Sequence, residues 1–370
     1  MQINVQSYNF FFIYAIFFVI LQPKSIFRMN TLGKNFVFTS FGESHGRAIG
    51  GVLDGVPAGV QIDLDMIRQA LDKRAGRLAA KGDEAIKREA GISPRAKREK
   101  DEVEWLSGVL DGVTLGTPIA FIIRNADTRS EDYDWLKHNY RLGHADKTYQ
   151  EKYGIRDHRG GGRASARETA SRVVAGAIAQ QLLADKNIHI SAQLIQVGVE
   201  TNPDKFEQYI ADIQKSGDSV GGIVECTITG LPMGLGEPIF DKLQSHLAYA
   251  MMSINACKGF EYGSGFSNVA LKGSEMYLSN DPQLVSGGIA GGISDGNPIV
   301  FRCVFKPTAT NRKTLEALCA EVQKLQELRS SGDSKIPVGR HDACVAVRAV
   351  AVVEAMAALV LQDFLSLHTK

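Results

Sequence analysis

Cysteine is scarce in this 370-residue sequence, and its five cysteines form no pattern. No two of them stand as a C-x-x-C pair, and all lie in apolar segments that are spread along the chain. An odd number of scattered cysteines is typical of reduced, buried thiols in a cytosolic protein, so a disulfide framework and a structural zinc site are excluded. A catalytic thiol is disfavoured because no cysteine lies in an electropositive loop beside a histidine. The cysteines are Cys226, Cys257, Cys303, Cys319 and Cys344.

The sequence also lacks an excess of charge of one sign. Its 42 lysines and arginines balance 41 aspartates and glutamates, which leaves a net charge of +1. No overall basic field therefore attracts the chain to nucleic acid or to an anionic membrane, and we expect neither as a partner. Recognition of phosphate, if it occurs, must come from local clusters of arginine.

The hydrophobic run near the N-terminus, residues 10–21, is too short to cross a bilayer, which takes about 20 apolar residues. No positively charged segment precedes it and no A-x-A cleavage site follows it, so a secretory signal fits poorly. A second methionine, Met29, opens the well-patterned part of the sequence. We predict that residues 1–28 are an N-terminal extension, either disordered or the product of a misassigned start, and that residues 29–370 form a single domain.

Several common functional motifs are missing. The Walker A pattern occurs nowhere, and "GHADKT" has no glycine before Lys147. "YGSGFSN" lacks the third glycine of a dinucleotide fingerprint. The sequence has no H-E-x-x-H metal site, so no metal is expected, and no G-x-S-x-G nucleophile turn.

Strands and helices alternate without a regular βαβ rhythm, which favours an α+β layered fold over a doubly wound sheet. Asp63 is the predicted N-cap of a helix over residues 63–74, and a hairpin is predicted to turn at Asp111-Gly112. From Arg74 to Glu104 the chain is dense in both charges, which is typical of a surface loop or lid. Further strands are expected over residues 35–42, 48–59, 188–200, 220–229 and 297–307, and further helices over 203–216, 241–255 and 349–365.

The segment "GIRDHRGGGRASARETASRVV" places arginines around three consecutive glycines, directly before a helix. Ser165 and Glu168 are spaced as a capping box, and an apolar residue at every fourth position predicts one buried face for the helix that follows. A helix N-terminus, a bare backbone at 160–162 and the guanidinium groups of Arg163 and Arg167 together suit a phosphate. The alternative is a loop whose arginines only pair with neighbouring carboxylates.

Two histidines and one aspartate lie in turns where a ligand could reach them. His45 stands in "FGESHGRAIGG" and His144 in "YRLGHADKTY", and the ordinary pKa of a histidine, about 6.5, suits proton transfer at neutral pH. Asp342, in "GRHDACVAV", is a candidate base. The alternatives are surface or structural histidines, and an aspartate that pairs with Arg340 or caps a helix.

Taken together, these segments resemble the chorismate synthase family. Its three signatures match "GESHGRAIGGVLDGVP", "GRASARETASRVVAGAI" and "RHDACVAVRAVAVVEAM". "RLGHAD", "SINACKGFEYGSGF", "GGIAGGISDGNPI" and "KPTAT" follow the family's order between them. The resemblance runs from about Met29 to the C-terminus, which makes 29–370 one catalytic domain. It implies a layered β-α-β sandwich, with a helical layer between antiparallel sheets.

The resemblance implies a lyase of the shikimate pathway of aromatic amino-acid biosynthesis. It converts 5-enolpyruvylshikimate 3-phosphate to chorismate and phosphate by 1,4-anti elimination. Reduced FMN is the implied cofactor, and it lends electron density while the C–O bond breaks. NADPH is required only if the chain reduces its own flavin; otherwise an external flavin reductase is a partner. A cytoplasmic homotetramer is also implied.

The resemblance also implies roles for individual residues. His45 would protonate or stabilise the departing phosphate, His144 would protonate the reduced flavin near its pyrimidine ring, and Asp342 would relay the C6 proton through the flavin N5 region. The residues implied in substrate binding are Arg74, Arg141, Arg167 and Arg340. Those implied in flavin binding are Arg163, Ala164, Ser165, Asn255, Ala256, Gly291, Lys306, Pro307, Thr308, Ala309, Thr310 and Arg340.

The sequence departs from the family pattern at three places. Ala164 replaces the usual serine, which removes a possible hydroxyl contact to flavin, and Leu142 replaces the usual proline. The charged segment after Arg74 is longer than in the family, so the next arginine that contacts substrate or nicotinamide stays open among Arg77, Arg88 and Arg95.

Two other classes of function remain as alternatives. A non-catalytic flavin- or nucleotide-binding protein would keep the glycines and arginines but would not need both histidines and Asp342. Nucleic-acid binding by residues 74–100 is disfavoured because acidic residues are interleaved with the basic ones.

Overall fold

The computed structural model describes residues 29–76, 101–125, 130–317 and 342–368. The chain divides into two compact units, residues 1–31 and 32–370, and the fold below is that of the second. The N-terminal extension predicted over 1–28 lies outside the described residues. A short strand, β1 (Thr31–Leu32), spans the boundary between the units.

The first sheet is antiparallel, and its long strands follow the order β2-β3-β7-β4. Alternate residues of β7, namely Ile119, Phe121 and Ile123, are fully buried, while the residues between them are partly exposed. Because successive side chains of a strand point to opposite faces, one face of this sheet packs against the core. The strands are β2 (Val37–Gly42), β3 (Ala48–Asp54), β4 (Val103–Ser107) and β7 (Ile119–Arg124).

The second sheet is also antiparallel, with the order β10-β13-β9-β8. β9 and β13 are its central strands and alternate regularly between buried and partly exposed residues. The strands are β8 (His189–Val197), β9 (Gly222–Thr229), β10 (Cys257–Tyr262) and β13 (Ile299–Phe305).

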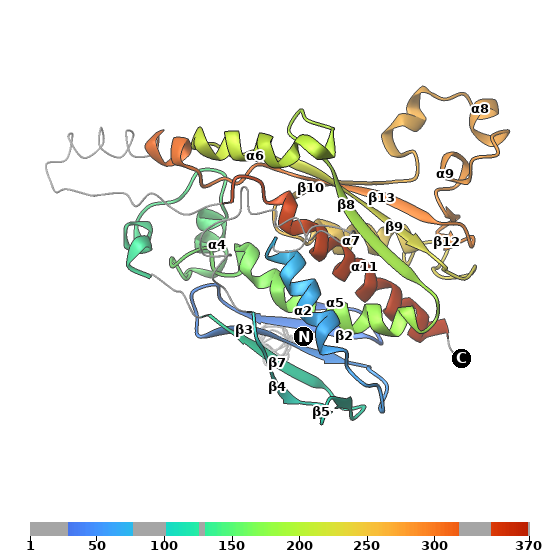
Figure 1. Cartoon of the computed structure of the whole chain (residues 1–370), viewed down its shortest axis with the longest axis horizontal. Coiled ribbons are helices and arrows are strands. Elements are labelled where there is room, and N and C mark those ends of the chain that lie inside the picture. Colours follow the sequence, from blue (N-terminus) through green and yellow to red (C-terminus); the bar gives the residue numbers. More distant parts are fainter. Residues whose placement is uncertain (1–28, 77–100, 126–129, 318–341, 369–370) are drawn as a thin grey trace, which may run out of the picture. The chain divides into compact units, whose positions relative to one another are not determined.

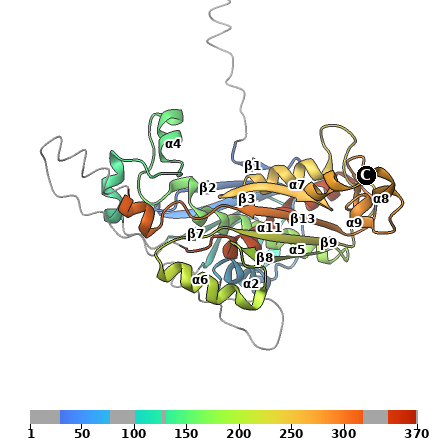
Figure 2. The same ribbon diagram turned by 90° about the horizontal axis from the view of Figure 1, so that it is seen from above.

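A layer of helices separates the two sheets (Figure 1; Figure 2). α11 contacts α2, α5 and α7 within the layer and β8 and β9 of the second sheet, while α5 contacts β3 of the first. α11 is long and apolar enough to cross a membrane, but 83% of its most apolar window is buried inside the protein, as expected of a core helix. The helices of the layer are α2 (Leu64–Arg74), α5 (Thr169–Ala184), α7 (Leu243–Met252) and α11 (Ala346–His368).

The remaining elements lie outside the four long strands of each sheet and the four helices of the layer, and α6 contacts β8. The helices are α4 (Asp146–Tyr153), α6 (Phe206–Lys215), α8 (Gly273–Tyr277) and α9 (Pro282–Val285). The 3-10 turns are η1 (Ser130–Lys137), η2 (Gly162–Ala164), η3 (Ala166–Glu168), η4 (Pro203–Lys205) and η5 (Gly265–Ala270). The two-residue strands are β5 (Val109–Leu110), β6 (Val113–Thr114), β11 (Ile289–Ala290) and β12 (Ile293–Ser294).

Most of the predicted elements are present. Asp63 caps α2, since its carboxylate accepts a hydrogen bond from the Met66 backbone N–H at 2.9 Å. The hairpin turns at Asp111 and Gly112, whose φ angles of 50° and 81° are those of the left-handed region that such two-residue turns require. Four cysteines are buried free thiols, and Cys319 lies outside the described residues.

Three local predictions are wrong. Ser165 caps η3 rather than α5: its hydroxyl accepts from the Arg167 backbone N–H, while Glu168 pairs with Arg172 instead of closing a capping box. α5 is buried on most of its surface rather than on one face, because it lies between two sheets. The charged segment 74–104 is not all surface loop, since Arg74 is fully buried at the end of α2 and residues 103–104 begin β4.

Candidate active site

His45 lies in the turn between β2 and β3, packed against the glycine turn at 160–162. Gly160 has a φ of 66°, and a Cβ atom there would lie 2.1 Å from His45 Nδ1, so only glycine fits. Ser44 Oγ lies 3.3 Å from the same ring nitrogen and accepts a hydrogen bond from the Gly161 backbone N–H. Tyr133 meets the imidazole edge-on, with ring centroids 4.9 Å apart. The buried histidine is thus held by its neighbour Ser44 and by two segments far from it in the sequence, at Tyr133 and Gly160.

His144 approaches the same glycine turn from the start of α4. Its Nδ1 atom lies 2.9 Å from Asp146 Oδ1 and 3.1 Å from Arg141 Nη2. Its Nε2 atom faces the turn, since a Cβ atom on Gly161 would lie 3.3 Å from it. His45 and His144, 99 positions apart in the sequence, therefore both contact residues 160–161.

Asp146 is the anion that organises this cluster. Its Oδ2 accepts hydrogen bonds from the backbone N–H and the Nε–H of Arg141, and its Oδ1 accepts from Arg141 Nη2 at 2.7 Å. Burial alone would raise the pKa of Asp146, but the hydrogen bonds from Arg141 and His144 hold it far below its usual value. Asp146 is therefore ionised throughout the physiological range.

Arg167 and Arg74 meet at a second buried carboxylate, Asp101. Arg74 is 0% exposed, and its Nη1 lies 3.2 Å from Asp101 Oδ2, while Arg167 Nη1 binds Asp101 Oδ1. Arg74 also donates to the Ala166 carbonyl at 2.8 Å and to the Thr169 hydroxyl at 3.0 Å, so it anchors η3. Burial would raise the pKa of Asp101, but the guanidinium groups of Arg74 and Arg167 outweigh it and lower the pKa.

Asp342 joins the same network through Arg348. Arg348 Nη1 donates to Asp342 Oδ2 at 3.0 Å, and its Nε donates to the Arg74 carbonyl at 3.4 Å. From Arg167 the network continues through Asn125, whose amide donates to the carbonyls of residues 43 and 46 on either side of His45. The described structure thus brings the three predicted catalytic residues into one connected network.

Most of the predicted flavin-binding residues surround this network. Arg163 Nη2 donates to Ser40 Oγ at 2.6 Å, and the Asn255 amide donates to the Arg163 carbonyl at 3.4 Å. Ala256 follows with a φ of 69°, an unusual value for a residue with a side chain. Lys306 Nζ donates to the Gly143 carbonyl at 2.7 Å, so the segment 306–310 lies beside the His144 turn.

The structure does not bring Gly291 to this group. Gly291 belongs to the β11–β12 hairpin, near the Ile299 end of β13, whereas Lys306 follows the other end (Figure 1). A strand of seven residues places its ends about 20 Å apart. Arg340, Arg77, Arg88 and Arg95 lie outside the described residues.

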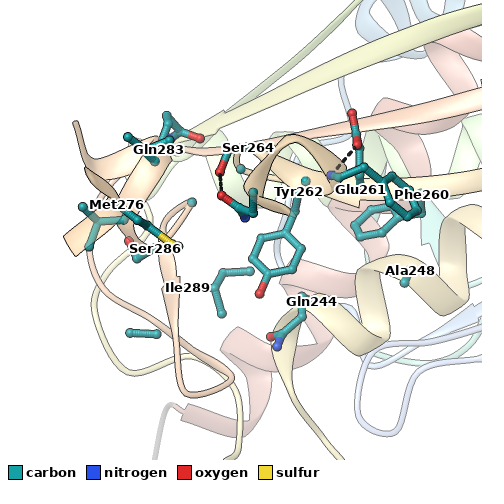
Figure 3. A pocket seen from close by; sticks show the side chains of 18 of the residues that line it. Gln244, Ala248, Phe260, Glu261, Tyr262, Ser264, Met276, Gln283, Ser286 and Ile289 are labelled. Carbon is teal, nitrogen blue, oxygen red and sulfur yellow. Dashed lines mark hydrogen bonds between the residues drawn. The ribbon is translucent and has the colours of Figure 1, made fainter. Parts of the chain in front are cut away.

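Gly291 instead lines a separate cavity of about 740 Å³ (Figure 3). Gln244 and Ala248 of α7 and Phe260 and Tyr262 of β10 form much of its wall. Residues 261–268, which form part of the wall, are held by two local hydrogen bonds. Glu261 accepts from the Phe266 backbone N–H, and the Ser264 hydroxyl donates to Asn268 (dashed lines in Figure 3). None of the predicted catalytic residues lines this cavity.

Asp101, Asp146 and Glu43 were not predicted as site residues. Burial raises the pKa of Glu43, which packs against the glycine turn so closely that a Cβ atom on Gly162 would lie 2.8 Å from Glu43 Oε2. Asp146 and Glu43 stand within motifs quoted from the sequence, so their proximity to the histidines was a usable signal. No such signal marked Asp101 in the sequence, because this residue follows a long run of mixed charges.

Comparison with known proteins identifies the family. The family model described as "Chorismate synthase" matches residues 36–366. The chorismate synthase of Christiangramia forsetii is 48% identical over 366 residues, covering 90% of this chain and 97% of the relative. That of Flavobacterium psychrophilum is 46% identical, covering 92% and 98%. The chain belongs to the chorismate synthase family.

A solved structure supports the same conclusion. The "Crystal Structure of Chorismate Synthase" superposes with a TM-score of 0.64 at 29% identity, covering 90% of this chain and 92% of that one. The predicted family, the layered α+β fold and the lyase activity of the shikimate pathway are confirmed.

Proposed function

We propose that this chain converts 5-enolpyruvylshikimate 3-phosphate to chorismate and phosphate by 1,4-anti elimination, using the residues around the glycine turn at 160–162. One observation carries the assignment of the site: His45 and His144 both meet this turn, and a hydrogen-bond network links it to Asp342. A protein that only binds flavin would have no need for this convergence.

His45 supplies a proton to the departing phosphate. The leaving group gathers negative charge in the transition state, where a fixed donor in a buried turn is most effective. The packing of the ring against Gly160 and Tyr133 supports this role, because it restricts the direction in which the imidazole can donate.

Asp342 takes up the proton lost from C6. Arg348 holds its carboxylate at 3.0 Å, which keeps the acceptor oxygen in place. His144 meets the glycine turn at Gly161 and is bound within the Asp146 cluster, which suits it to the proposed role of proton donor to the flavin.

The arginines bind the phosphate and carboxylates of the substrate. Arg141 Nη1 makes no hydrogen bond in the described part of the chain, so its hydrogens are available to a ligand oxygen. Arg74 and Arg167 are retained in the proposal as substrate contacts from the family motif, and in the described structure both bind the Asp101 carboxylate. Arg340 is retained in the proposal as a further substrate and flavin contact.

Reduced FMN is the proposed cofactor, and the residues present fit such a group. The hydroxyl of Thr308 is buried without a hydrogen-bond partner among the described residues, so it has an unused donor and acceptor for such a group. Residues 163–165, 255–256 and 306–310 would hold it, with Gly291 as a further proposed contact. When bound, reduced FMN supplies electron density as the C–O bond breaks. NADPH is a further cofactor only if the chain reduces its own flavin.

The proposed assembly is a cytoplasmic homotetramer. Exposed large apolar side chains support association, since Phe240 is 92% exposed and Phe266 and Leu278 are each 82% exposed. Light scattering of the purified chain tests the oligomeric state: a fourfold molar mass supports the tetramer, and a monomer contradicts it.

An anaerobic assay tests the reaction. The purified chain, mixed with substrate and chemically reduced FMN, should release phosphate and form chorismate in equal amounts. Replacing His45 or His144 by Ala should lower turnover by about 10²-fold or more. Absence of release by the wild-type chain would rule out the reaction, and a full rate in either variant would rule out that histidine. Repeating the assay with NADPH and oxidised FMN tells whether an external reductase is needed.

A further inference from the structure

The Asp146 cluster contains more hydrogen-bond donors than a simple ion pair requires. Asp146 accepts four hydrogen bonds: three from Arg141 and one at the position of His144 Nδ1. Four is the number that a carboxylate can accept with its two oxygens. Each donor in the cluster can therefore be assigned to one acceptor.

The hydrogens of Arg141 Nη2 settle which ring nitrogen of His144 carries a proton. This atom has two hydrogens, and it lies 2.7 Å from Asp146 Oδ1 and 2.7 Å from the Gly160 carbonyl oxygen. Both hydrogens are used by these shorter bonds to oxygen. None is left for His144 Nδ1 at 3.1 Å.

His144 Nδ1 must then supply the hydrogen of its own contact with Asp146. An unprotonated Nδ1 would point a lone pair at a carboxylate oxygen 2.9 Å away, which is repulsive. Asp146 cannot supply the hydrogen, because the hydrogen bonds from Arg141 and His144 outweigh its burial and hold its pKa far below the usual range.

We propose that Asp146 is a positioning residue that keeps His144 protonated at Nδ1, so that Nε2 is the nitrogen that accepts or donates a proton at the glycine turn. In the described part of the chain Nε2 makes no hydrogen bond, and it faces Gly161. In the neutral ring Nε2 accepts a proton, and in the charged ring it donates one. Asp146 thus orients the imidazole without touching the substrate. The catalytic consequence rests on the proposed function, but the tautomer does not.

Arg156 gives the cluster a second cation. Its Nη1 lies 3.9 Å from Asp146 Oδ1, and its Nη2 donates to the Asn139 carbonyl at 3.2 Å. The guanidinium also lies over the Tyr140 ring, 5.2 Å from its centroid. With Arg141 and Arg156 beside it, Asp146 can stay ionised while it accepts from His144.

Nitrogen NMR of the full chain with ¹⁵N-labelled histidine tests this inference, because protonated and unprotonated ring nitrogens have well-separated shifts. The loss of one ring's signals in His144→Gln assigns the resonances. The wild-type chain should show a protonated Nδ1, and Asp146→Asn should move the neutral proton to Nε2. Asp157→Asn is the matched control, since Asp157 forms a similar fork with Arg159 at 2.8 Å but no bond to a histidine.

Three outcomes would overturn the inference: an unprotonated Nδ1 in the wild type, a protonated Nδ1 in Asp146→Asn, or the same switch in Asp157→Asn. If Asp146→Asn does not fold, the wild-type spectrum decides alone. The spectra need neither flavin nor substrate, so they separate this inference from the proposed reaction. In the anaerobic assay, Asp146→Asn should lower kcat by about 10²-fold, and Asp157→Asn should retain the wild-type kcat.

Discussion

Asp146 and Asp101 are both buried carboxylates bound by arginines, yet they differ in what their neighbours can still do. Around Asp146, Arg141 Nη1 and His144 Nε2 make no hydrogen bond to any residue that the structure describes. Around Asp101, the guanidinium of Arg74 is 0% exposed and bonded at Nε, Nη1 and Nη2.

This difference separates two uses of the same ion pair. A fully enclosed pair is destabilised strongly when one partner is removed, because the remaining charge stays buried. Where part of the pair is accessible, water can solvate the remaining charge, and the loss of stability is smaller. The Asp101 cluster therefore holds the helix layer to η3 and β4, whereas the Asp146 cluster orients the imidazole of His144.

The largest expected effect comes from neutralising Asp101. Asp101→Asn leaves two buried guanidinium groups without their anion and should lower the free energy of unfolding by about 3–5 kcal/mol. Urea denaturation monitored by circular dichroism measures this. A loss no larger than that of Asp146→Asn would contradict the distinction between the clusters.

A smaller loss is expected for Asp146→Asn, about 2–3 kcal/mol, because Arg141 keeps its bond to the Gly160 carbonyl and an open Nη1. The same denaturation experiment measures it. The main effect of Asp146→Asn should be a lower kcat, because His144 loses its orientation. A variant that is destabilised but fully active would show that Asp146 is only structural.

Acid should weaken both clusters. The folded-state pKa of each carboxylate is lowered below the unfolded value of about 3.9. Their stabilising contribution is therefore complete above that value and is lost as the pH falls below it. The contribution of these two carboxylates to the free energy of unfolding should be nearly constant between pH 7 and about pH 5 and fall below about pH 4. Asp101→Asn should make the fall shallower, and an unchanged slope would argue against the pairing.

The smallest effect should come from a surface pair of the same chemistry. Asp65 binds Arg68 on the exposed side of α2, with both side chains more than 70% exposed. Such pairs contribute little because water screens them. Asp65→Asn should leave the unfolding curve nearly unchanged, and a large shift would mean that burial is not what distinguishes Asp101.

Local patterns predicted much of this fold. The strand β9, the Asp63 cap and the Asp111-Gly112 turn depend on residues close in sequence, so they could be found without coordinates. The two histidine turns were visible as glycine-flanked segments, and the family resemblance assigned their roles.

Contacts between distant segments could not be predicted in this way. Asp101 follows a charged segment that looks solvent-exposed, and only the arrival of Arg74 and Arg167 explains its burial. α5 shows no single buried face because sheets cover it on both sides. Gly291 was grouped with the other flavin contacts by motif, although β13 separates it from Lys306 within the chain.

Single-turnover phosphate release by Gly160→Ala tests the central claim most directly, which is that the glycine turn holds His45 in a catalytic position. The matched control is Gly154→Ala, which has a similar φ of 74° but nothing within 4 Å of the added Cβ atom. We expect a rate at least ~10²-fold lower for Gly160→Ala, because its Cβ atom displaces His45, and a much smaller change for Gly154→Ala. Equal rates in the two variants would contradict the claim.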